Sequence, residues 1–331
     1  MYNYRLILLK SKNYDIFLIS LSDFLFNLVQ ISYITIYKQM IKEQQYIIQN
    51  IESFELNHIF DCWQCFRWNK QEDWSYVWVF KNNVLNIQKK DNSIVFKWVI
   101  NWDIQSIITQ YFDLERDYNQ IKNQLEKIDK YMQESIRYWH WIRLLNQDLR
   151  ETIISFIISA NNNIPRIKWI IERLSQKYWT EIIRDWQQYF TFPTAEQLKD
   201  VSVSDYRNLW LWFRDERIFI TTRMILDWKI DLNSFYSKDT QTIREELLNL
   251  SWVWPKVADC ILLFSDLKRL EVFPIDVRVR RVMNQLYIHN SDETKVNKNQ
   301  IQKIADEKFW NYAGLAQEYL FYRIRSQKSL S

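Results

Sequence analysis

The architecture can be inferred from one stretch, "NLSWVWPKVADC", residues 249–260. Its proline suits the first turn of a helix, because proline lacks an N–H that such a turn would leave unpaired. The residues before Pro255 then belong to a tight turn, where glycine is favoured. The chain places Trp252 and Trp254 there instead. With glycine at both positions, the stretch becomes the end of one helix, a glycine hairpin and the start of a second helix.

Glycine is almost absent from the whole chain. The 331 residues contain only Gly314 but 17 tryptophans, whereas average usage of about 7% predicts roughly 23 glycines. Tryptophan stands in polar stretches such as "EDWS", "DWKID" and "FWN", where glycine is usual. Only Trp68, in "CFRWN", has the neighbours of an ordinary tryptophan. Our hypothesis is that the other 16 are glycine codons translated as tryptophan; UGA is the candidate, since genetic codes assign it differently.

The remaining composition is that of a globular protein, with 47% hydrophobic and 25% charged residues. A net charge of +4 permits a polyanionic partner without requiring one. Three cysteines make no disulfide framework, so we expect a reducing, cytoplasmic compartment. Cys62 and Cys65 have half the spacing of a zinc site, but no second pair follows, so we expect no metal or other cofactor.

The first 39 residues differ from the rest. Residues 14–37 lack Lys and Arg and are long enough to span a bilayer. They also carry Asp15 and Asp23, which are costly at membrane depth. We interpret residues 1–39 as an extension from a start assigned too far upstream, with Met40 as the true start. A membrane anchor is the alternative.

The remainder divides into two regions. From about residue 47 to 110, "FELNHIF", "CFRWN", "SYVWVFK", "VLNIQK" and "SIVFKWVI" are typical of short strands between turns. Further on, "YNQIKNQLEKIDKYMQESI", "RETIISFIISA", "IPRIKWIIERLSQKY" and "TAEQLKDV" have helical apolar spacing. We predict an α+β fold: a small antiparallel β-sheet domain over residues 40–135, then an α-helical domain over 136–331 with a helix-hairpin-helix at about 243–264.

A helix-hairpin-helix aims backbone N–H groups at a DNA phosphate, and glycine allows the close approach. Lys256 falls in the first turn of its second helix, and Asp276, in "VFPIDVRVRRVM", stands at an expected N-cap. A lysine with a carboxylate suits imine chemistry at a sugar carbon, if burial and the helix N-terminus favour the free amine. Taken singly, Lys256 could be an ordinary solvated lysine and Asp276 an ordinary cap.

Six motifs together resemble one family. "FDCWQCFRWN", "SFIISANNNIPRIKWIIERL", "LWLWFRDERI", "LSWVWPKVADCILLF", "FPIDVRVRRVM" and "YAGLAQEYLFY" are similar, in order over about residues 47–327, to the 8-oxoguanine DNA glycosylase/AP lyase family of the helix-hairpin-helix glycosylase superfamily. Glycine improves the match at seven tryptophans, namely Trp63, Trp169, Trp210, Trp212, Trp252, Trp254 and Trp310.

The resemblance implies base-excision repair by a monomer that acts on double-stranded DNA containing 8-oxoguanine paired with cytosine. Lys256 matches the nucleophile that attacks the sugar C1′, expels the base and forms the Schiff base that leads to strand cleavage by β-elimination. Asp276 matches the carboxylate that stabilises positive charge on the sugar. Both roles are expectations from the resemblance.

The resemblance also implies a pocket for the flipped base. The base is expected between Cys260 and Phe321, with Gln317 on its pairing edge and Pro274 lining the pocket. Trp63 matches a glycine whose carbonyl accepts the N7–H of 8-oxoguanine. Gln317 and Phe321 are four apart and so share a helix face.

The remaining matches concern the DNA. Asn161, Arg166 and Arg214 match residues that read the orphaned cytosine, and Phe213 matches an aromatic wedge, although "NNN" alone would be a turn and an N-cap. The positions matched to phosphate contacts are Trp252, Trp254 and Arg278. If the protein does contain tryptophan at these positions, we predict that the indoles block the hairpin from the DNA phosphate and the pocket from the base, and that activity is lost.

Three other classes are alternatives. Endonuclease III-like and adenine-specific relatives carry a four-cysteine iron–sulfur cluster near the C-terminus, and no cysteine follows Cys260. Alkylpurine glycosylases lack the lysine that Lys256 provides. A non-catalytic helix-hairpin-helix DNA-binding protein would not need Lys256 and Asp276 beside a base pocket, and borohydride trapping separates this class from a Schiff-base enzyme.

Overall fold

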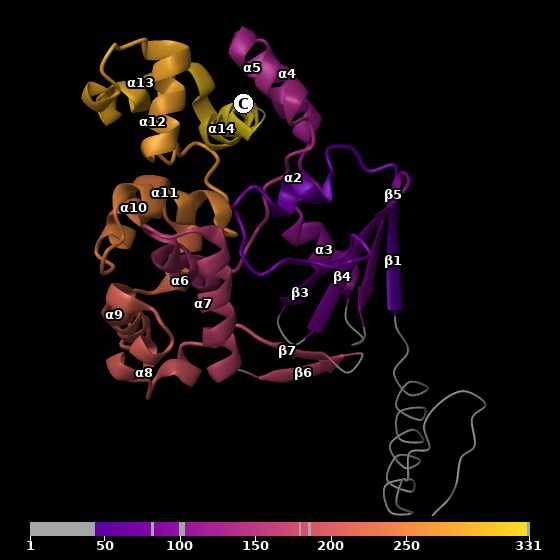
Figure 1. Ribbon diagram of the computed structural model, residues 1–331, viewed down its shortest axis with the longest axis vertical. Helices are drawn as coiled ribbons and strands as arrows, with labels where there is room; N and C mark the ends of the chain where they lie inside the picture. The colour runs from indigo at the N-terminus through magenta and orange to yellow at the C-terminus, as the bar shows by residue number, and fades with distance from the viewer. Residues whose placement is uncertain (1–43, 81–82, 99–102, 179, 185–186, 330–331) are drawn as a thin grey trace, which may run out of the picture.

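The computed structural model describes most of the chain (Figure 1). The segment for which we expected an upstream start or a membrane anchor, residues 1–39, lies outside the described part. Among the helices that are described, none combines the length and the apolar character needed to cross a bilayer. The described ranges are 44–80, 83–98, 103–178, 180–184 and 187–329.

A five-stranded antiparallel sheet occupies the first part of the chain, in the order β1-β5-β4-β3-β2. One face carries the alternate residues Tyr76 and Trp78 of β3 and Ile94 and Phe96 of β5, and packs against α2 (Leu56–Phe60) and α3 (Ile104–Tyr111). This period of two is what a half-buried sheet requires. The strands are β1 (Gln44–Gln49), β2 (Asn69–Lys70), β3 (Tyr76–Phe80), β4 (Asn83–Lys90) and β5 (Ser93–Trp98).

Three of the five predicted strands, "SYVWVFK", "VLNIQK" and "SIVFKWVI", are confirmed as β3, β4 and β5, but the other two predictions are wrong. "FELNHIF" contains α2, because its apolar residues Leu56, Ile59 and Phe60 have i, i+3, i+4 spacing and are buried together. "CFRWN" is irregular up to Trp68, and β2 begins only at Asn69. The prediction also missed β1, which pairs with β5 at the edge of the sheet.

Helices make up most of the remaining chain, as predicted. Asp129 divides the expected helix at 118–136 into two, because its carboxylate accepts hydrogen bonds from the Tyr131 and Met132 N–H groups and so starts a new helix. "TAEQLKDV" forms only a short 3₁₀ turn, and a β-hairpin, β6 (Glu181–Arg184) and β7 (Gln187–Phe190), was not predicted. The helices are α4 (Tyr118–Glu126), α5 (Lys130–Tyr138), α6 (Leu149–Ser159), α7 (Ile164–Lys177), α8 (Val203–Asn208), α9 (Asp215–Leu226), α10 (Thr240–Leu248), α11 (Pro255–Phe264), α12 (Val277–Met283), α13 (Lys298–Phe309) and α14 (Ala313–Ser329).

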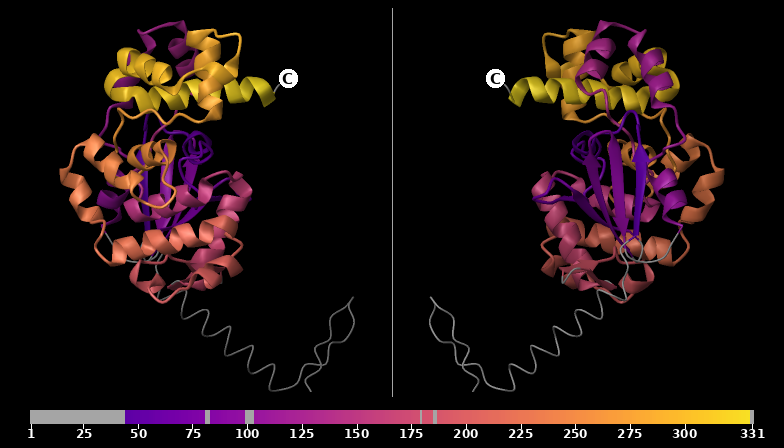
Figure 2. Two further views of the ribbon diagram at one scale, coloured as in Figure 1. Left: turned by 90° about the vertical axis from the view of Figure 1, so that its left-hand side faces the viewer. Right: turned by 90° about the vertical axis from the view of Figure 1, so that its right-hand side faces the viewer.

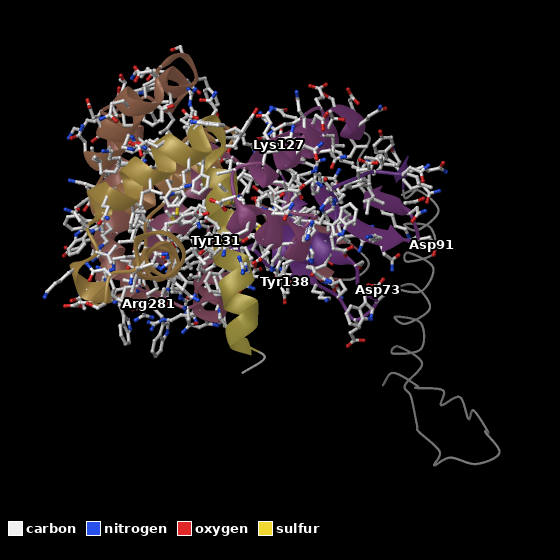
Figure 3. The ribbon with its side chains drawn as sticks, turned by 90° about the horizontal axis from the view of Figure 1, so that it is seen from above. Asp73, Asp91, Lys127, Tyr131, Tyr138 and Arg281 are labelled. Carbon is white, nitrogen blue, oxygen red and sulfur yellow. The ribbon has the colours of Figure 1, made fainter. Side chains whose placement is uncertain are left out.

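The helices form two groups around the central helix α6, which is apolar nearly all round and packs against α7, α9 and α11. Helices α12 to α14 lie with α4 and α5 at one end of the molecule, and α8 and α9 lie at the other (Figure 2). Seen from above, Tyr131 and Tyr138 of α5 lie beside α14 (Figure 3), and Arg323 of α14 pairs with Glu134 of α5. The proposed domain boundary at residues 135–136 therefore falls within a helix that packs on the C-terminal region.

Gly314 is the second residue of α14 and lies where α14 passes close to α11. A Cβ at this position would lie 2.4 Å from Leu263 Cδ1 and 2.9 Å from the Val272 carbonyl oxygen. We expect Gly314→Ala to lower the free energy of unfolding by about 1–3 kcal/mol, the usual cost of overpacking a tight contact. Urea unfolding measures this change, and an unaltered midpoint and slope would contradict the close approach.

Half of the described tryptophans have a backbone that favours glycine. Trp102, Trp179 and Trp186 lie outside the described residues, and seven of the other 14 have positive φ. Only a few per cent of non-glycine residues adopt such a conformation, and for bulky residues it is an outlier. The pattern supports glycine in the natural polypeptide at these seven positions, which are Trp63, Trp74, Trp210, Trp212, Trp228, Trp252 and Trp310.

Trp68 behaves as a true tryptophan. Its side chain is 1% exposed, and its indole N–H donates to the Tyr111 hydroxyl at 3.0 Å. In contrast, Trp74 is 70% and Trp228 76% exposed. Trp78, buried in β3, stacks on Trp68 without positive φ. At Trp78 the backbone therefore gives no support for the glycine hypothesis.

Candidate active site

The helix-hairpin-helix is confirmed, with α10 and α11 as its helices. Between them, the Val253 N–H donates to the Leu250 carbonyl at 3.1 Å and closes a turn. Trp252, the third residue of this turn, has a φ of 64°, which in a type II turn calls for glycine or asparagine. Both Trp252 and Trp254 are more than half exposed. The two indoles therefore cover the surface where the hairpin would meet a phosphate.

A cavity of about 70 Å³ lies beside the first turn of α11. It contains Lys256 and is also lined by Asp276, which ends the loop before α12. All five residues expected to hold the base line the same cavity, although they come from the loop after α2, from α11, from the loop before α12 and from α14. These residues are Trp63, Cys260, Pro274, Gln317 and Phe321.

Asp276 is the N-cap of α12, as predicted. Its carboxylate accepts a hydrogen bond from the Val279 N–H at 2.7 Å. Capping holds the carboxylate in the lining of the cavity, where its negative charge acts on Lys256. The ordinary role as a cap and the expected role in the site are therefore compatible.

Lys256 is half-buried, and its Nζ lies 5.6 Å from the centre of the Phe156 ring. Burial lowers the pKa of the Lys256 amine, but Cys260, Asp276 and Glu318 together outweigh burial and raise this pKa above its usual value. The expectation that the surroundings favour the free amine is therefore wrong for the protein without DNA. The ammonium form is stabilised, so nucleophilic attack requires a group that takes its proton.

Trp63 fills part of the cavity at Lys256. Its ring centre lies 5.7 Å from that of Phe321, and the Arg278 guanidinium carbon lies 4.8 Å from the Trp63 ring centre. The cavity that remains, about 70 Å³, is well below the roughly 300–1,000 Å³ typical of small-ligand sites. Trp63 has a φ of 63°, so glycine would suit the backbone and would also open the pocket.

The residues matched to the orphaned cytosine cluster near the N-terminus of α9. Arg214 is buried and donates to the carbonyl oxygens of Ala160 at 2.6 Å and Asn161 at 2.8 Å. Its guanidinium carbon lies 4.2 Å from the centre of the Phe213 ring, and the Phe213 side chain is 46% exposed. Arg214 thus holds the Asn161 loop, and Phe213 projects as a wedge would.

The same cluster is strongly positive. Burial, Arg166 and Arg217 lower the pKa of Arg214 to about 10. Arg166 stacks on the Trp212 ring, 4.3 Å from its centre. The sequence prediction missed Arg217, whose guanidinium carbon lies 4.5 Å from the Phe213 ring centre. Its place three residues after Arg214, one turn along a helix, was the available signal.

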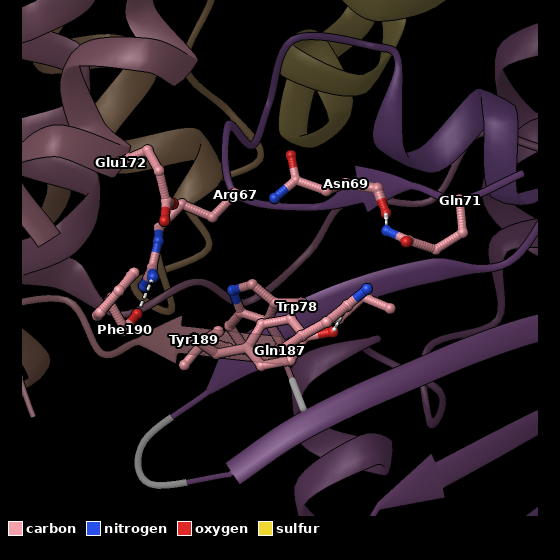
Figure 4. A pocket seen from close by; sticks show the side chains of 10 residues that line it. Arg67, Asn69, Gln71, Trp78, Glu172, Gln187, Tyr189 and Phe190 are labelled. Atoms are coloured by element: carbon pink, nitrogen blue, oxygen red, sulfur yellow. Dashed lines mark hydrogen bonds between the residues drawn. The ribbon is translucent and has the colours of Figure 1, made fainter. Parts of the chain in front are cut away.

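A second cavity, of about 100 Å³, lies between β3 and the β6–β7 hairpin (Figure 4). Arg67 and Glu172 line it, and the Arg67 guanidinium donates to the Phe190 carbonyl. None of the residues predicted for the site lines this cavity. The candidate active site is therefore the cavity at Lys256.

Glu318 was also missed by the sequence prediction. It follows Gln317 in α14, is 4% exposed and lines the Lys256 cavity. A single carboxylate within the apolar run "GLAQEYLFY" was a signal, because Glu is rarely buried without a partner or a role.

The sheet, the helix-hairpin-helix and the cavity with its lysine together define a base-excision DNA glycosylase of the helix-hairpin-helix class. The N-terminal domain model of 8-oxoguanine DNA glycosylase matches residues 46–153, and the model of the HhH-GPD superfamily of base excision DNA repair proteins matches residues 154–307. The chain belongs to the 8-oxoguanine DNA glycosylase family.

Individual relatives agree with this assignment. The chain is 29% identical over 238 residues to a probable N-glycosylase/DNA lyase of Methanothermobacter thermautotrophicus, covering 66% of this chain and 74% of that protein. It is 36% identical, with a TM-score of 0.80, to the Clostridium acetobutylicum 8-oxoguanine glycosylase/lyase in complex with double-stranded DNA that has cytosine opposite 8-oxoguanine, covering 87% of this chain and 98% of that one. A 3-methyladenine DNA glycosylase of Archaeoglobus fulgidus, 16% identical with a TM-score of 0.67, shares only the fold.

Proposed function

We propose that this protein excises 8-oxoguanine paired with cytosine from double-stranded DNA and then cleaves the strand at the abasic site, as a bifunctional N-glycosylase and AP lyase of base-excision repair. The observation that carries the proposal is the single cavity that gathers Lys256 and Asp276 with the five residues matched to the base. The protein is expected to act as a cytoplasmic monomer without a cofactor, which size-exclusion chromatography and metal analysis would test.

In this proposal Lys256 is the nucleophile. Its free amine attacks the sugar C1′, the bond from C1′ to the base nitrogen breaks, and the base leaves with the bonding electron pair. Loss of a proton and opening of the sugar give a Schiff base, which acidifies the C2′ proton and permits β-elimination of the 3′ phosphate. Asp276, fixed as the cap of α12, stabilises the positive charge that develops on the sugar.

The other residues bind the DNA. Cys260 and Phe321 enclose the base, Gln317 meets its pairing edge, and Pro274 closes the pocket. Glycine at position 63 would offer a carbonyl to the N7–H that distinguishes 8-oxoguanine from guanine. The remaining proposed contacts are Asn161, Arg166 and Arg214 to the orphaned cytosine, Phe213 as the wedge, and residues 252 and 254 with Arg278 to the phosphates.

Asp276→Asn distinguishes the role of Asp276 as the N-cap of α12 from the role of its negative charge in the reaction. Asparagine caps a helix as well as aspartate does, so we expect the thermal midpoint to stay the same. The loss of negative charge at the reacting sugar should slow single-turnover excision by about 100- to 1,000-fold. An excision rate equal to that of the parent would contradict the proposed role of Asp276.

A further inference from the structure

Glu318 places a second carboxylate in the cavity that Lys256 lines. It projects from α14 into the cavity that Lys256 enters from α11, and its Oε2 atom is buried without a hydrogen-bond partner among the described residues. Such a group is costly to bury unless it exchanges a proton or meets a charge. The ionisable groups that face it are Cys62, Lys256, Cys260 and Asp276.

These neighbours set the protonation of Glu318. Burial raises the pKa of its carboxyl to about 8; Lys256 acts against this shift, Asp276 adds to it, and a hydrogen bond with Gln317 also opposes it. A carboxyl that titrates near neutral pH is suited to proton transfer. Burial raises the pKa of Cys260 to about 11, so the thiol stays neutral and does not compete as a proton acceptor.

We propose that Glu318 accepts a proton from the Lys256 ammonium and so produces the amine that attacks C1′, a step that rests on the proposed function above. One N–H bond of the ammonium breaks and its electron pair stays on Nζ. Because no hydrogen bond joins Nζ to Oε2, the proton passes through one water in the cavity, which gives a proton to Oε2 of Glu318 as it takes one from Nζ. Asp276 is less suited to this step, because its carboxylate is engaged by the Val279 N–H.

The test is the pH dependence of Schiff-base formation in the full chain with glycine in place of every tryptophan except Trp68. Single-turnover borohydride trapping on 8-oxoguanine:cytosine duplex is followed from pH 5.5 to 9.5 in the parent and in Glu318→Gln, which keeps the shape but cannot accept the proton. The parental rate should rise with pH and level off once the Glu318 carboxyl has lost its proton. Glu318→Gln should be about 100-fold slower at pH 7 and should keep rising beyond pH 8.

Two further variants complete the test. Tyr319→Phe removes a buried neighbouring hydroxyl outside the cavity and should keep the parental dependence of the trapping rate on pH. Glu318→Asp should restore part of the trapping rate that Glu318→Gln loses, and its rate should level off at high pH as that of the parent does. If the trapping rate of Glu318→Gln is lower than that of the parent by the same factor at every pH, or is equal to it, the proposed proton transfer is wrong. Either result would leave the proposed function intact. No trapping by the parent at any pH would overturn both.

Discussion

Lys256→Gln is expected to eliminate the covalent complex with damaged DNA under borohydride and to slow base excision by on the order of 10⁴-fold or more, the usual cost of removing a nucleophile. Glutamine occupies a similar volume but cannot form an imine. Lys256 lies in the first turn of α11 and is only half-buried, so we expect the free energy of unfolding to change little.

The matched control is Lys303→Gln on α13, an exposed lysine that pairs with Glu307 and lies outside the cavity. It should trap and excise as the parent does. Gel analysis of trapped complexes and single-turnover excision measure both effects. Excision by Lys256→Gln within tenfold of the parent would mean that another group is the nucleophile.

Changing Trp252 and Trp254 to glycine is expected to tighten DNA binding by about 100-fold or more. The two indoles stand on the exposed hairpin, and the backbone at position 252 already has the conformation that glycine favours. Removing the indoles would free the N–H groups of the hairpin and of the N-terminus of α11 to meet a phosphate. Fluorescence anisotropy at a fixed salt concentration measures the change, because such contacts are salt-dependent.

Trp68→Gly is the control for that double change. Trp68 is buried and its indole N–H is hydrogen-bonded to Tyr111, so glycine there should lower the free energy of unfolding by about 3–5 kcal/mol without tightening DNA binding. Equal affinity before and after the hairpin changes would contradict the account of Trp252 and Trp254.

Local sequence rules were sufficient for the elements that local chemistry determines. Pro255 marked the start of α11, Asp276 the cap of α12, and the alternating runs the strands β3 to β5. The strand prediction for Leu56 to Phe60 was wrong because a short apolar run fits a strand or a helix equally well. Only the packing of this segment against the sheet distinguishes the two.

The predicted residues that line the Lys256 cavity could be identified from the six motifs and their order along the chain, but the pKa of Lys256 could not. The pKa of Lys256 depends on burial and on Cys260, four residues further along α11, but also on Asp276 and Glu318, which are distant in sequence and approach it only in the folded chain. Position 256 alone suggested a lowered pKa through burial, and Cys260 together with the two carboxylates reverses this direction. The reversal is also the reason that a proton acceptor is needed.

The most direct test of the proposed Schiff-base activity compares two full chains on 8-oxoguanine:cytosine duplex under borohydride. One chain has the 17 tryptophans of the printed sequence, and the other has glycine at every one of them except Trp68. We predict that the glycine chain forms a covalent complex that disappears with Lys256→Gln, and that the tryptophan chain forms none. A folded glycine chain that binds the duplex but gives no complex would contradict the account and favour a non-catalytic DNA-binding protein.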